Sequence, residues 1–106
     1  MSSWSIYNKG KTIGTTSPEG GLILSDEFNE DGARITLKRG NSYVSVSLSI
    51  RGWMDHTRFF NTDADAQREY RAMRSAVVNV LKIINTKGVS EIKVWEAISD
   101  FVRRFP

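Results

Sequence analysis

Residues 43–51 read YVSVSLSIR, and this stretch decides the fold. Serines alternate with apolar side chains that share one side of an extended chain: Val44, Val46, Leu48 and Ile50. Strict alternation predicts a β-strand with one face against a hydrophobic core and the other face in water. We therefore expect this strand to belong to a sheet that is covered on one side.

Further strand segments lie on both sides of this one, and turn signals that contain glycine separate them. They predict an antiparallel meander of four to five strands over residues about 4–60, including a pair around Asn8-Lys9-Gly10. The phase of the last strand stays open, because large rings occur on both of its faces. Besides 43–51, the expected strands are 22–28, 33–38 and 53–60.

After residue 61 the spacing of apolar residues becomes helical. Thr62 and Asp65 have the form of a capping box, which predicts a helix that begins at Thr62. The pattern predicts two amphipathic helices, over residues about 62–86 and 90–104. Because a sheet with one apolar face needs a second layer, we predict a single α+β domain over residues 1–106, with the meander packed on two C-terminal helices.

The composition excludes several kinds of site. The chain has 106 residues, no cysteine and a single histidine, His56, which excludes disulfides, thiolate zinc sites, a cysteine nucleophile and a multi-histidine metal site. Its net charge of +3 at pH 7 is only mildly basic. No apolar run approaches the about 20 residues of a membrane span, and no secretory signal is evident. We therefore expect a cytoplasmic protein with no membrane partner.

Motifs for catalysis and cofactor binding are incomplete in this chain. Lys9-Gly10-Lys11-Thr12 ends like a phosphate-binding P-loop, but Ser5 stands where that loop needs a glycine. Asp55 and His56 are adjacent, and adjacent strand residues point to opposite faces. Carboxylates cluster within residues 26–31 beside a turn, where solvation is the simplest explanation. We predict a protein that is not an enzyme and has no cofactor and no metal.

The polar side of the predicted sheet offers a candidate binding surface. If the apolar residues of 43–51 face the helices, then cations, hydroxyl groups and an aromatic ring share the opposite face. Such a face is typical of open sheets that bind single-stranded nucleic acid or other anions. A plain solvated sheet face is the alternative. The candidate residues are Arg34, Lys38, Tyr43, Arg51 and, if the last strand has the matching phase, Arg58.

Large rings near the end of the meander indicate a different candidate, an interface with a protein partner or a second copy in a homodimer. Burial of the same rings beneath the second helix is the alternative. The candidate residues are Trp53, Phe59, Phe60 and Trp95. We predict a small protein-interaction or self-associating module. Single-stranded nucleic-acid binding through the sheet face is the alternative function.

Overall fold

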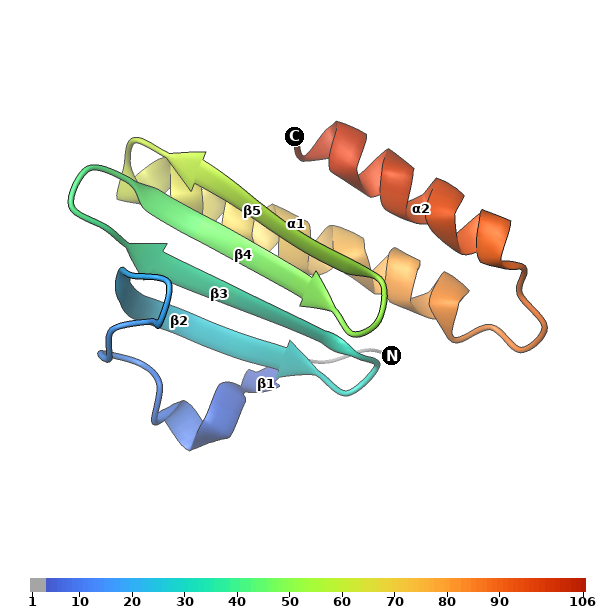
Figure 1. Cartoon of the computed structure of the whole chain (residues 1–106), viewed down its shortest axis with the longest axis horizontal. Coiled ribbons are helices and arrows are strands. Elements are labelled where there is room, and N and C mark those ends of the chain that lie inside the picture. Colours follow the sequence, from blue (N-terminus) through green and yellow to red (C-terminus); the bar gives the residue numbers. More distant parts are fainter. Residues whose placement is uncertain (1–3) are drawn as a thin grey trace.

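The computed structural model describes residues 4–106 and confirms the α+β class (Figure 1). Five antiparallel strands form one sheet in the order β1-β2-β3-β4-β5, so each strand pairs with its neighbours in sequence. The strands are β1 (Trp4–Ile6), β2 (Leu22–Asn29), β3 (Ala33–Arg39), β4 (Val44–Ile50) and β5 (Met54–Phe60). Two helices follow, α1 (Asp63–Ile84) and α2 (Glu91–Arg104).

Both helices lie on one side of the sheet (Figure 1). α1 crosses behind the central strands, and α2 lies beside α1, beyond β5. Thr62 caps α1 as predicted, because its Oγ1 accepts a hydrogen bond from the Asp65 backbone N–H at 3.2 Å. Neither helix covers the other face of the sheet, which we call the outer face. No helix within residues 4–106 is long and apolar enough to cross a membrane.

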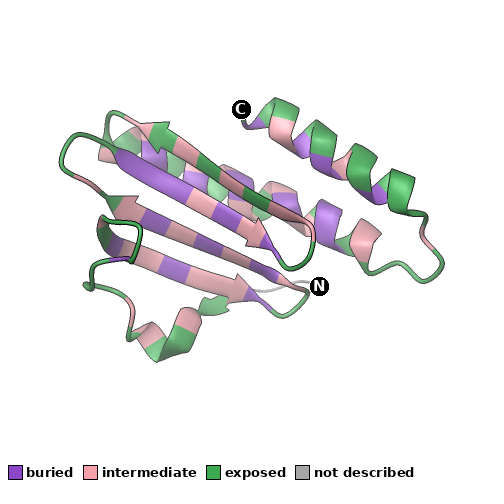
Figure 2. Ribbon diagram, in the orientation of Figure 1, coloured by how far each residue is buried: buried purple, intermediate pink, exposed green. Residues whose placement is uncertain are grey.

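The apolar residues of β4 lie in the core, as the alternation predicts. Figure 2 shows that buried residues concentrate in the central strands and along one side of each helix. The strands contribute Ala33, Ile35, Leu37, Val44, Val46, Leu48 and Ile50 to this core. The helical part of the chain contributes Ala66, Tyr70, Met73, Val77, Val80, Leu81, Val94, Ile98, Phe101 and Phe105.

The phase of β5 places its two central basic side chains on the helix side of the sheet. His56 and Arg58 pair with buried residues of β4, so they share the face of those residues. Arg58 donates to Glu69 of α1 at 2.8 Å and is largely buried there. His56 Nε2 lies 2.5 Å from the carbonyl oxygen of Phe105. The prediction that Arg58 extends the outer face is therefore wrong.

The N-terminal segment departs from the predicted strand pair. β1 pairs with β2, and residues 7–10 form a short 3-10 turn in which Asn8 and Lys9 adopt positive φ values of 49° and 56°. The chain then returns beside β2, where the Gly14 N–H donates to the Ile23 carbonyl at 2.8 Å. Residues 7–21 therefore form a loop that packs along β2 (Figure 1).

Two of the clustered carboxylates are structural rather than solvated turn residues. Asp26 is fully buried, and Glu27 is half-buried beneath α1. Tyr70 and Arg74 of α1 donate to Glu27 Oε1 at 2.6 and 2.8 Å. Burial of Tyr70, together with its hydrogen bond to Glu27, raises the pKa of Tyr70 above its ordinary value. Solvation in a turn is the wrong explanation for these two carboxylates, because both belong to β2.

Candidate functional site

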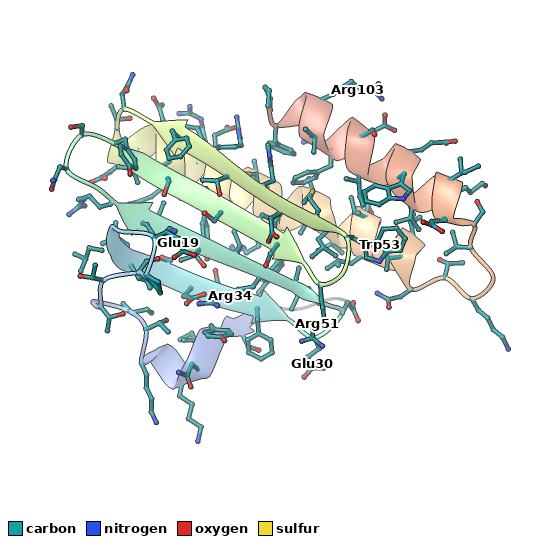
Figure 3. The ribbon with its side chains drawn as sticks, in the orientation of Figure 1. Glu19, Glu30, Arg34, Arg51, Trp53 and Arg103 are labelled. Carbon is teal, nitrogen blue, oxygen red and sulfur yellow. The ribbon has the colours of Figure 1, made fainter. Side chains whose placement is uncertain are left out.

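The outer face contains an open groove with a volume of about 640 Å³. Hydroxyl groups of the three strands β3, β4 and β5 contribute much of its floor, and the loop 17–21 forms one wall. Figure 3 shows Glu19 of this loop over the sheet near β2 and β3, with Arg34 farther along the same strands. We call this feature the outer groove. Its floor hydroxyls belong to Thr36, Ser45, Ser47, Ser49 and Thr57.

Two aromatic rings stand at one end of the outer groove. Tyr43 and Phe59 meet edge to face with their ring centroids 5.1 Å apart, and they are 45% and 64% exposed. The Tyr43 ring lies against the backbone of Gly40, where an added Cβ would come within 3.1 Å of the ring. Gly40 thus allows the ring to lie flat over the turn between β3 and β4. The structure adds Phe59 to a surface for which the sequence analysis had identified only Tyr43.

Arg34 is engaged within the protein at the floor of the groove. Its Nε and Nη2 donate to the two carboxylate oxygens of Asp26 at 2.9 and 2.7 Å, and its Cζ lies 3.6 Å from the centre of the Tyr7 ring. Thr12 and Thr36 donate to the same carboxylate at 2.8 and 3.2 Å. Burial opposes ionisation of Asp26, but the bonds from Arg34 and the threonines outweigh it and hold the pKa of Asp26 below its usual range.

The remaining charges of the groove come from Lys38 and two acids. Ser17 Oγ donates to Glu19 Oε2 at 2.6 Å, and this bond, together with a backbone bond and the charge of Lys38, lowers the pKa of Glu19. Asp55 lies near the opposite end of the groove from the ring pair. Two cations and two acids therefore line the groove, and their formal charges cancel. The outer face is hydroxyl-rich, as expected, but it is not a basic surface.

The other predicted site residues lie outside the outer groove. Arg51 is exposed in the turn between β4 and β5 (Figure 3). Trp53 and Phe60 are half-buried against the core. The Trp53 ring meets that of Trp95 edge to face, with centroids 5.2 Å apart, and Trp95 stays 45% exposed. The four candidate interface residues are thus divided, since Phe59 faces the outer groove while Trp53 packs against Trp95 of α2.

The sequence analysis missed two acids that shape the groove, Asp26 and Glu19. The turn at residues 30–32 could have revealed Asp26, because a hairpin closed there places Asp26 opposite Thr36 and next to Arg34. No comparable signal exists for Glu19, whose position depends on the path of the loop that carries it.

Within residues 4–106, no group of three or more histidine, aspartate or glutamate side chains is arranged to hold a metal ion. The His56 side chain contacts the Phe105 carbonyl oxygen. It therefore lies on the opposite side of the sheet from the floor hydroxyls. The described side chains that line the groove are rings, hydroxyls and charged groups.

No protein-family model, curated protein or solved structure matches this chain.

Proposed function

We propose that this chain is a non-enzymatic protein-interaction module whose outer groove binds an extended segment of a partner protein. The observation that carries the proposal is the exposed pair of Tyr43 and Phe59 at the end of a groove whose lining charges cancel. Aromatic side chains are enriched in protein interfaces and dominate their binding energy. A groove without net positive charge suits a polypeptide better than a polyphosphate chain.

The shape of the groove supports an extended occupant. It follows β4 and β5 from the ring pair toward Ser49 and Asp55, so a segment in strand-like conformation fits along it. The accessible hydroxyls of the floor, those of Ser49 and Thr57, can exchange hydrogen bonds with the amides of such a segment. The ring pair offers a contact for one apolar side chain, while Lys38 and Glu19 can each pair with an opposite charge.

Selection from a displayed library of random linear peptides tests this function. We expect the wild-type chain to enrich peptides that share an apolar residue. We expect Phe59→Lys to weaken binding of an enriched, labelled peptide by about tenfold or more in fluorescence anisotropy, since loss of an aromatic hot-spot contact typically costs about 2 kcal/mol or more.

Ile92→Lys is the matched control, because Ile92 is an equally accessible apolar residue on α2, outside the groove. It should leave the affinity for the peptide unchanged. Failure to enrich any peptide, or equal loss of affinity in both variants, would contradict binding in the outer groove.

A second candidate function is binding of single-stranded nucleic acid, and the ring pair beside Lys38 favours it because two rings can stack on successive bases. Arg34 is already paired with Asp26, so Lys38 is the cation that the groove offers to a phosphate, and this candidate predicts a shallow salt dependence, with a slope of log K against log salt no steeper than about −0.7. Titration of labelled oligo(dT) and oligo(U) at several salt concentrations measures it. Loss of binding in Tyr43→Ala would support this candidate, whereas absence of binding at low salt would remove it.

A further inference from the structure

The solvent side of α1 carries a row of exposed polar side chains, on the opposite side of the molecule from the outer groove (Figure 1). These residues recur every three or four positions, which keeps them on one side of the helix. All of them are exposed, and the charged ones are all basic. We call this surface the α1 stripe. Its members are Arg68, Arg71, Ser75, Asn79, Lys82 and, just after the end of α1, Thr86.

The acidic residues of α1 leave most of this stripe uncompensated. They lie in the first two turns of the helix, and each is paired with an arginine. No Asp or Glu occurs in residues 70–90. Beyond Arg68, the stripe therefore contains only basic and neutral side chains. The pairs of the first two turns are Asp63 with Arg39, Asp65 with Arg68, and Glu69 with Arg58.

Three exposed basic side chains of this acid-free stretch take part in no hydrogen bond or ion pair within residues 4–106, and they belong to Arg71, Lys82 and Lys87. Arg74 differs, because it donates to Glu27 of β2 at 2.8 Å. The helical rise of about 1.5 Å per residue separates Arg71 from Lys82 by about 16 Å along the axis. Lys87 follows in the connection between α1 and α2. All three are available to an anion from outside the chain.

One flank of α2 adds positive charge to this side of the molecule. Trp95 faces the sheet layer, because its ring contacts that of Trp53. The opposite flank of α2 therefore lies on the same side as the α1 stripe, and its helical positions carry Lys93 and Arg104. The same flank holds one acid, Asp100, whose charge is compensated by an ion pair within α2.

The other acids near this side do not cancel its charge. Glu91 lies one turn before Trp95 and shares its sheet-side flank, and Glu96 projects from the outer side of α2. Asp31, in the turn between β2 and β3, reaches the C-terminal end of the stripe, where its carbonyl oxygen accepts from Asn85 at 3.3 Å. Basic residues therefore outnumber acidic residues along the α1 stripe and the adjoining flank of α2.

A straight row of cations with small polar residues between them is complementary to the phosphates of a nucleic-acid duplex. Ser75 and Asn79 let a phosphate backbone approach closely, and both can donate hydrogen bonds to its oxygens. No member of the stripe is aromatic, so it has nothing to stack on unpaired bases. It also lacks apolar side chains to insert into a lipid surface, because the apolar side of α1 is packed in the core.

We propose that the α1 stripe binds the phosphate backbone of double-stranded nucleic acid without regard to base sequence. The stripe and the outer groove lie on opposite sides of the molecule, so the proposal is independent of what the groove binds. If Arg71, Lys82 and Lys87 each neutralise one phosphate of a DNA duplex, the slope of log K against log salt is about −2.7. Binding is therefore weak and sensitive to salt.

Fluorescence anisotropy of the full chain with short, labelled DNA duplexes, at several salt concentrations, tests the proposal. We expect binding at low salt, with equal affinity for two duplexes of unrelated sequence. Arg71→Gln combined with Lys82→Gln should weaken binding by about tenfold or more at low salt and make the slope shallower by about 1.8, since two phosphate contacts are lost. Both residues are exposed, and far-ultraviolet circular dichroism would show that the variant remains folded.

Lys9→Gln combined with Lys11→Gln is the matched control, because it makes the same charge change at two exposed residues of the N-terminal loop. It should leave the affinity and the slope unchanged, as should Lys38→Gln in the outer groove. Absence of binding at low salt, or equal weakening in the control, would overturn the proposal. Loss of binding in Lys38→Gln alone would also overturn it and would place the duplex at the groove. Binding to phosphatidylserine vesicles but not to the duplexes would overturn it in favour of an anionic membrane surface.

Discussion

Replacement of Leu48 by alanine is expected to lower the free energy of unfolding by about 2–5 kcal/mol. Leu48 is 1% exposed, at the centre of the strand face that packs on α1. Truncation removes its apolar contacts and leaves a cavity that the surrounding strands and helix fill only partly. Urea denaturation of the two proteins, followed by circular dichroism, measures the difference.

Ser47 provides the control for this substitution, because it is the adjacent residue on the opposite face of the same strand. Its hydroxyl lies 3.0 Å from that of Thr57 in an exposed setting, so Ser47→Ala should change the free energy of unfolding by no more than about 0.5 kcal/mol. Equal losses at both positions would mean that the outer face is packed like the core. The outer groove would then be unavailable to a ligand.

Replacement of Asp26 by alanine is expected to cost about 3 kcal/mol of stability at neutral pH. The substitution removes the shared acceptor of Arg34, Thr12 and Thr36, which tie the N-terminal loop to the outer face. Arg34 stays partly exposed and can be hydrated, so we expect the lower end of the range for breaking a buried ion pair. Asp55→Ala, which removes an exposed acid from the same face, should have an effect within about 0.5 kcal/mol.

The pH dependence of stability provides a second measurement on Asp26. Its pKa is lower in the folded chain than in the unfolded chain, so its carboxylate stabilises the fold at pH above about 4, and this contribution is lost as the pH falls through the folded-state pKa. Asp26→Ala should therefore show a smaller loss of stability on acidification than the wild-type chain. Identical acid sensitivity in the two proteins would contradict this role.

Most of the fold could be predicted because its signals are local. Apolar residues alternate with serines in β4 and recur every three to four residues in the helices, and each pattern indicates burial of one side of the element. The helix cap at Thr62 is also encoded by neighbouring residues, and the hydrogen bond to Asp65 confirms it. These signals need no knowledge of which strands or helices meet.

The outer groove could be predicted only in part, because it depends on register and on the path of a loop. The rings of β5 lie on both of its faces, so hydropathy leaves the phase of that strand open. The turn after β4 pairs Ile50 with Met54, and this register directs Arg58 to the helix side, where Glu69 compensates its burial. Likewise, Arg34 looked like a free cation because its partner, Asp26, lies on another strand.

The order of the elements along the chain has a consequence for biosynthesis. Each strand from β2 to β5 pairs with the strand that precedes it in the sequence. The sheet can therefore form strand by strand during translation, because no pairing requires a distant segment. The apolar face of the sheet, by contrast, is covered by helices that are translated afterwards. Until α1 emerges, the nascent sheet exposes these aliphatic side chains to solvent or to a chaperone, and we expect the polypeptide to be most prone to aggregation during this interval.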